Sequence, residues 1–173
     1  TWASVMDVDM NWKNNCFVIA GNCTPSSSAV ATHYKFYYNI IYRANDVINN
    51  ISNVPDMADT EKAQYIAECK FLRAWAYFGL NVLWKGVPIY TENVDATEAN
   101  KPRNSEAEVW DQIIKDLTDC INEANLPAKY PQGNSSYGRI TKGAAYAFRG
   151  QAYQFLGDYS NALADFEAIE GLG

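Results

Sequence analysis

Residues 65–90, YIAECKFLRAWAYFGLNVLWKGVPIY, are the stretch that decides the fold. Apolar residues recur every three or four positions, which is the spacing of one face of an α-helix. The pattern extends back to Asp59 or Thr60, either of which can act as an N-cap, and forward to about Trp84. The sequence KGVP at 85–88 should end the helix, because Gly accepts a left-handed conformation and Pro lacks an amide donor. The predicted buried face comprises Ala63, Ile66, Ala67, Lys70, Phe71, Ala74, Tyr77, Phe78 and Val82.

The composition of the chain is that of an ordinary globular domain. Its 173 residues are 48% hydrophobic and 20% charged, which is enough to build one domain around a core. The 14 Lys and Arg residues and 20 Asp and Glu residues give a net charge of −6 and form no cationic cluster, which argues against nucleic-acid binding. No run reaches the roughly 18 apolar residues of a membrane span. The chain opens at Thr1 without an initiator Met or a signal segment, so we expect a processed or partial chain.

A second helix is predicted before this stretch. From Thr32 to Pro55 the residues Tyr37, Ile41 and Ile48 fall at helical spacing. The preceding residues, 1–32, are the least regular part, with TPSSS at 24–28 typical of a loop, and we expect a helix start or short turns there.

Three more helices are predicted after the stretch. Ser105 and Glu108 make a capping box that opens a helix through about Ala124. Thr141 should cap a helix that ends at Leu156 and Gly157, and a last helix should follow from about Tyr159 to Ile169. The segments between these helices, 89–104 and 126–138, lack periodicity and are predicted as long loops. The buried face of the first of these helices is predicted to be Val109, Trp110, Ile113, Ile114, Leu117 and Ile121.

The last two helices match a tetratricopeptide unit, in which Gly150, Tyr153, Ala162 and Phe166 stand at the expected spacing. The stretch 65–90 and the capping-box helix can be laid on the same unit. In that alignment Arg73 corresponds to Arg149, and Asp116 corresponds to Asp165. The sequence therefore predicts an all-α fold of tetratricopeptide-like helix pairs with long loop insertions, in one domain over 1–173 with an irregular part, 1–32, and helical repeats, 33–173.

The arginines of the two units, Arg73 and Arg149, each stand beside a small residue. Their duplication indicates a structural role, which we expect to be hydrogen bonding to loop carbonyls. Glu68 lies five residues before Arg73, and an ion pair or cap between helices is favoured over catalysis for these two.

The residues that usually build metal or catalytic sites are sparse. The only histidine, His33, is expected at a cap or an interface. The motif Asp7, Asp9, Asn11 begins like a calcium loop, but Trp12 replaces the Gly and Val18 the Glu that such a loop needs. We therefore predict no metal, no cofactor and no catalytic residue.

The four cysteines do not form a disulfide framework or a C-x-x-C pair. Cys69 and Cys120 fall within helical patterns and are expected to be small buried residues. The spacing of Cys16 and Cys23 allows a bridge or two free thiols, and both remain open.

Ligand contact is predicted in the N-terminal segment, outside clear helical periodicity. Sugars are bound by aromatic faces together with amide and carboxylate hydrogen bonds, and Trp2 and Trp12 with Asn11, Asn14 and Asn15 offer that mixture. The alternative is that the two tryptophans only cover the edge of the core.

Four segments of the chain resemble the SusD/RagB family of outer-membrane nutrient-binding lipoproteins of Bacteroidetes. In chain order they are YYNIIYRANDVINNI, with Ala44 and Asn45; AECKFLRAWAYFGLNVLWKGVPIY, with Glu68, Phe71, Arg73, Ala74, Gly86 and Pro88; PRNSEAEVWDQIIKDLTDCINEANLP, with Arg103, Ser105, Asp116, Leu117, Leu126 and Pro127; and GRITKGAAYAFRGQAYQFLGDYSNAL, with Gly138, Arg139 and Thr141. Their order and spacing agree with the family over roughly residues 34–170. Cys69 and the pair Trp84 and Lys85 depart from the usual family residues.

The resemblance implies a surface-exposed lipoprotein of the outer membrane that captures an oligosaccharide or other nutrient. Its expected partner is a SusC-like TonB-dependent transporter, and its contact with the membrane would be only through a lipid anchor that this chain lacks. Because family members are longer, with a lipid-bearing Cys and a large C-terminal portion, we expect a fragment that holds the helical repeats. Two other functions compete with nutrient capture: a helical-repeat scaffold that only docks a protein, and a hydrolase with paired carboxylates.

Overall fold

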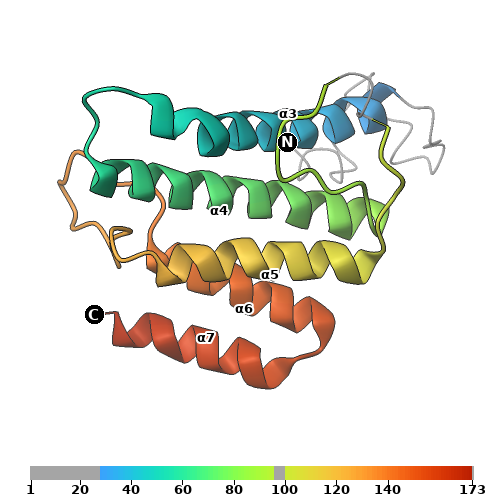
Figure 1. The fold of residues 1–173 in the computed structure, drawn as a ribbon. Helices are drawn as coiled ribbons and strands as arrows, with labels where there is room; N and C mark the ends of the chain where they lie inside the picture. Colours follow the sequence, from blue (N-terminus) through green and yellow to red (C-terminus); the bar gives the residue numbers. More distant parts are fainter. Residues whose placement is uncertain (1–27, 96–99, 173) are drawn as a thin grey trace, which may run out of the picture. The chain divides into compact units, whose positions relative to one another are not determined.

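In the computed structural model the described residues are 28–95 and 100–172, and within these ranges every regular element is a helix (Figure 1). The predicted all-α fold class is confirmed. The elements in chain order are α3 (Ser28–Asn50), the short 3₁₀ helix η1 (Ile51–Asn53), α4 (Asp59–Trp84), α5 (Glu106–Asn122), α6 (Lys142–Leu156) and α7 (Tyr159–Gly171).

The chain divides between Phe36 and Tyr37 into two units. In the first unit, the described residues belong to the beginning of α3, where Thr32 Oγ1 donates a hydrogen bond to the Ser28 carbonyl at 2.7 Å. The second unit holds the rest of α3 and all the later helices. The helix seen in the sequence from Thr32 thus extends further back, since α3 already includes Ser28, and a helix start within residues 1–32 is confirmed.

The start of α4 differs from the prediction. Ala58, not Asp59 or Thr60, is the N-cap, and its carbonyl accepts hydrogen bonds from the amides of Glu61 and Lys62 at 3.0 and 2.9 Å. Asp59 is the first helical residue, where its carboxylate instead complements the positive end of the helix dipole. The capping preferences of the residues could not locate the start of α4, because the N-cap residue, Ala58, makes no side-chain capping bond.

The other helix ends follow the sequence closely. Ser105 and Glu108 form the full capping box, with Glu108 N to Ser105 Oγ at 3.2 Å and Ser105 N to Glu108 Oε2 at 2.7 Å. Thr141 caps α6 through the amide of Ala144, and Gly157 ends it in the left-handed region at φ 75°. The KGVP turn is confirmed too: Lys85 is the left-handed C-cap of α4 at φ 57°, and Gly86 follows at φ 90°.

Within the second unit, α4 packs against α5, α5 against α6, and α6 against α7. Successive helices in this series run antiparallel (Figure 1). From Tyr37 onward α3 lies along α4, where the rings of Tyr37 and Trp75 are 5.6 Å apart. Because α4 lies between α3 and α5, it buries more than one face. The predicted face is therefore incomplete, and four residues outside it are also buried: Arg73, Ala76, Leu80 and Asn81.

The second helix pair has the close approach that the tetratricopeptide pattern predicts. A Cβ added at Gly150 on α6 would lie 2.6 Å from Cε1 of Phe166 on α7, so only glycine fits against this ring. Ala162 on α7 is 2% exposed. The first pair, α4 and α5, carries an ion pair at the positions that correspond to Arg149 and Asp165, which confirms the alignment of the two units.

Candidate functional site

The residues predicted to bind ligand, Trp2, Asn11, Trp12 and Asn14, lie outside the described residues. So do Asn15, the Asp7-Asp9-Asn11 motif, and Cys16 with Cys23. Those predictions stay predictions. Within the described ranges the densest polar arrangement is a buried network centred on Arg73, and it holds the connection 85–104 between α4 and α5.

Arg73 on α4 forms a two-pronged ion pair with Asp116 on α5. Nε donates to Oδ2 at 2.8 Å and Nη2 donates to Oδ1 at 2.7 Å, and the two side chains are 5% and 0% exposed. Burial on its own would lower the pKa of the Arg73 guanidinium, but the hydrogen bond and charge of Asp116 outweigh it and the pKa is raised. The guanidinium therefore stays charged, and the pair joins the two helices through two hydrogen bonds.

The remaining guanidinium nitrogen of Arg73 joins this ion pair to the connection. Nη1 donates to Asn45 Oδ1 at 2.7 Å and to the carbonyl of Thr91 at 3.1 Å. Asn45 is 1% exposed, and its amide donates to the carbonyls of Tyr90 and Glu92 at 3.0 and 3.3 Å. Three successive carbonyls of a segment without regular structure are thus held by two buried side chains.

Two tyrosines secure the beginning of the same segment. The hydroxyl of Tyr77 accepts from the amide of Tyr90 at 2.7 Å and donates to its carbonyl at 3.1 Å. Tyr38 on α3 donates to the carbonyl of Pro88 at 2.8 Å. Burial raises the pKa of Tyr77, so its hydroxyl keeps the proton that this pair of bonds requires.

The base of the connection is closed by a second set of bonds to the backbone. Asn81 accepts from the amide of Gly86 at 2.8 Å and donates to the carbonyl of Glu106 at 3.0 Å. Arg103 donates to the carbonyls of Trp84, Lys85 and Gly86, the last at 2.7 Å. A Cβ at Gly86 would meet the carbonyl oxygen of Asn104 at 2.5 Å, so the two ends of the connection touch only because this residue is glycine.

Arg149 repeats the ion pair in the second helix pair. Its Nε and Nη2 donate to the two carboxylate oxygens of Asp165 at 2.8 and 2.6 Å, and Nη1 donates to Thr118 Oγ1 at 2.8 Å. The structural role expected of these arginines is confirmed, and the expected bond to a loop carbonyl is present for Arg73, although the chief partner of each arginine is the aspartate on the neighbouring helix. Only Arg73 adds a loop carbonyl, and Arg103 is the residue that binds several.

Glu68 also makes an ion pair, although not with Arg73. It contacts Arg139, which precedes α6, at 2.9 Å, and Arg139 lies over the ring of Tyr65 at 4.8 Å from its centroid. Glu68 further accepts from Gln64, whose amide donates to the hydroxyl of Tyr130 at 2.7 Å. The expected structural role of Glu68 is confirmed, and its effect is to hold the loop 126–141 against α4.

The buried polar side chains of this site hold loop backbone in place. No group of three metal-ligating side chains occurs in residues 28–95 or 100–172. Burial raises the pKa of the Cys120 thiol to about 12 and also raises that of Cys69, so neither is prepared to act as a nucleophile. Cys120 is buried as expected, whereas Cys69 is half-buried. None of the helices in the described part of the chain is both long and apolar enough to cross a membrane.

Comparison with known proteins identifies the family. The SusD-like family, described as starch-binding and associating with the outer membrane, matches residues 2–153. A SusD-like protein of Formosa agariphila, P38, is 35% identical over 147 residues, which are 84% of this chain and 27% of that protein. The chain thus spans about a quarter of the length of this relative.

Solved structures agree with this assignment. A SusD-like protein from Bacteroides fragilis is 27% identical with a TM-score of 0.78, over 88% of this chain and 29% of that one. A SusD-like protein described as laminarin-binding is 30% identical with a TM-score of 0.74, over 81% of this chain and 30% of that one. The family match covers most of the chain, and the helix pairs superpose on solved members. The chain therefore belongs to the SusD-like family.

Proposed function

We propose that the protein binds an oligosaccharide at the cell surface and delivers it to a SusC-like TonB-dependent transporter in the outer membrane, without catalysing a reaction. The observation that carries the proposal is the family match over residues 2–153, to a family described as starch-binding and associating with the outer membrane. A relative whose structure is similar, at 30% identity, is described as laminarin-binding. A β-glucan or an α-glucan is therefore the first substrate class to test.

The proposed ligand contacts are Trp2, Asn11, Trp12 and Asn14. An indole face stacks on the C–H groups of a sugar ring, and an amide can donate and accept hydrogen bonds with adjacent hydroxyls. The described residues contribute a framework of packed helix pairs.

The proposal is tested by calorimetric titration of the intact protein with laminarihexaose and maltoheptaose. Binding of either glucan, weakened about tenfold or more in Trp12→Ala, is the expected result. Tyr159→Ala, which removes an aromatic ring 71% exposed on α7, is the matched control and should bind like the wild type. Absence of binding to these and to a wider glycan and peptide panel would overturn nutrient capture, and turnover of any glycan would overturn the non-catalytic assignment.

A second candidate function, protein docking without a ligand, is favoured by one observation. The end of the last helix pair exposes three large apolar side chains: Phe155, Leu156 and Leu163. Repeat proteins commonly bind partners on such exposed helix surfaces. If docking is the only function, Leu163→Glu abolishes co-purification with the transporter while Trp12→Ala leaves the affinity for every glycan unchanged.

A further inference from the structure

The connection between α4 and α5 meets α3 at several points, and together they make one surface. Tyr38 and Asn45 of α3 bind the carbonyls of Pro88, Tyr90 and Glu92. One residue further along, the amide of Asn93 donates to Asp46 Oδ1 at 3.3 Å. The segment 88–93 therefore runs along α3 over about two helical turns.

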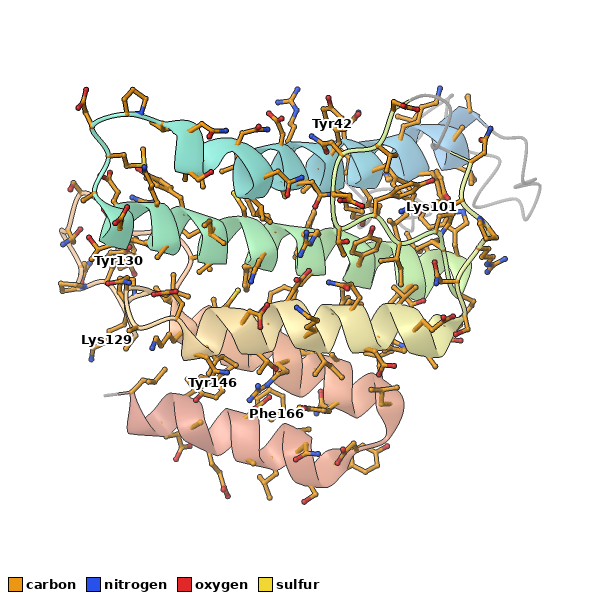
Figure 2. The ribbon with its side chains drawn as sticks, viewed as in Figure 1. Tyr42, Lys101, Lys129, Tyr130, Tyr146 and Phe166 are labelled. Carbon is orange, nitrogen blue, oxygen red and sulfur yellow. The ribbon has the colours of Figure 1, made fainter. Side chains whose placement is uncertain are left out.

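Tyr42 lies on α3 between Tyr38 and Asp46, two residues that bind the segment 88–93. It lies one turn after Tyr38 and one turn before Asp46, on the same side of α3, because residues four apart share a helix face. Its side chain is nevertheless 58% exposed, while Ile41 beside it in sequence is 1% exposed. Figure 2 shows Tyr42 on α3 at the edge away from α4. An aromatic ring is thus presented to solvent beside a loop that is held in place.

Two polar side chains on this part of the surface, Asp46 one turn after Tyr42 and Asn93 bonded to it, have unused hydrogen-bonding capacity. Asp46 is exposed, and its Oδ1 accepts from Asn50 at 3.0 Å as well as from Asn93. A carboxylate offers about four acceptor positions, so Asp46 retains capacity for further donors. The Oδ1 atom of Asn93 is buried and has no donor among the described residues, which is uncommon in a folded protein.

The loop that completes this surface has no regular secondary structure, yet buried side chains hold its backbone. Arg73 and Asn45 commit buried polar groups to its carbonyls, whereas the equivalent nitrogen of Arg149 binds Thr118 within the helices. Among the described residues, the arginine of the first helix pair therefore adds a loop contact that the arginine of the second pair does not make. Fixing a loop before a ligand arrives lowers the entropic cost of binding, which is how preorganised sites gain affinity.

We propose that Tyr42, Asp46 and Asn93 form a carbohydrate-contact surface of their own, on which the Tyr42 ring stacks against a sugar, the Asp46 carboxylate binds its hydroxyls and the Asn93 amide orients that carboxylate. An exposed aromatic face with a carboxylate and an amide beside it is the chemistry that recognises a sugar ring. The inference rests on the proposed function, and it adds a contact surface separate in sequence from Trp2 and Trp12.

The experiment is a titration of the intact protein with laminarihexaose and with maltoheptaose, comparing the wild type, Tyr42→Ala, Tyr42→Phe and the control Tyr159→Ala. For the glucan that the wild type binds, Tyr42→Ala should raise Kd about 5- to 10-fold, and Tyr42→Phe should stay within about twofold because the ring is kept. Equal thermal unfolding midpoints for the four proteins would exclude a folding effect.

The outcomes separate the two proposals. Wild-type binding that Tyr42→Ala leaves unchanged would overturn this surface and leave the proposed function standing. An equal loss in Tyr42→Ala and Tyr159→Ala would overturn it as well, since the ring on α7 is remote in sequence from the surface. A wild type that binds neither glucan would contradict the proposed function for these substrates and this inference with it.

Discussion

Arg73 and Asp116 face each other across α4 and α5 with two parallel hydrogen bonds of 2.8 and 2.7 Å, and almost no solvent reaches either side chain. The second helix pair repeats this relationship in Arg149 and Asp165. In the first pair the arginine also holds the connection 85–104 through the carbonyl of Thr91. The same side chain therefore contributes both to the stability of the helix pair and to the position of the loop.

Asp116→Asn should lower the free energy of unfolding by about 3–5 kcal/mol, because it leaves the guanidinium of Arg73 buried without its counter-charge. Urea denaturation measures this loss. The control is Lys85→Ala, which removes an ion pair with Glu106 whose side chains are 66% and 42% exposed and should cost no more than about 1 kcal/mol. Equal small losses in both variants would mean that the buried pair contributes no more than a surface pair.

Asn45→Ala should loosen the connection without breaking the Arg73–Asp116 pair, since it removes the donor to Tyr90 and Glu92 and the acceptor for Arg73 Nη1. We expect faster cleavage after Glu92 by a glutamate-specific protease under native conditions, followed by mass spectrometry. Asn50→Ala is the matched control, because that amide bonds only to Asp46 one turn back on α3. Unchanged cleavage in Asn45→Ala would show that other bonds suffice to hold the loop.

Gly150→Ala should destabilise the protein by about 1–3 kcal/mol, although alanine favours helices. The new Cβ would lie 2.6 Å from the ring of Phe166 and would push α6 and α7 apart. Gly143→Ala on the same helix is the control, because its nearest new contact is 3.5 Å and no shift is needed. Thermal unfolding of the two variants decides the point, and Phe166→Leu should recover part of the loss in Gly150→Ala.

Stability should fall as pH rises above about 9. Burial raises the pKa of Cys120 from 9.0 to about 12, so the thiol in the unfolded chain ionises first and draws the equilibrium toward unfolding. This contribution is complete below pH 9 and is lost by up to about 1.4 kcal/mol per pH unit as pH rises toward 12. Tyr77, whose pKa burial also raises, adds a loss in the same direction above pH 10.

Urea denaturation at pH 8 and pH 10 tests this dependence, with Cys120→Ala expected to show a smaller loss than the wild type. The native Cys120 thiol, which donates to the Ala67 carbonyl at 3.0 Å, should also resist alkylation at pH 8 and react once unfolded. Rapid labelling of Cys120 in the native protein would contradict its buried, protonated state.

The sequence determined those features that depend on residues close together in the chain. Helical spacing predicted α4 to α7, the Ser105 and Glu108 capping box and the Gly157 cap were right to the residue, and the spacing of Gly150 and Phe166 predicted a close helix contact. The four aligned segments also identified the family. These patterns succeed because capping and periodicity are set within one or two turns of the same helix.

Only the tertiary structure decided which partner each buried polar residue takes. Arg73 stands 43 residues from Asp116 and 28 from Asn45, and Glu68 stands 71 residues from Arg139. No local pattern distinguishes these partners, since several acids and amides lie at similar spacing on each helix. The burial of Arg73, Ala76, Leu80 and Asn81 was missed because it depends on α4 lying between α3 and α5, which come before and after it in the chain.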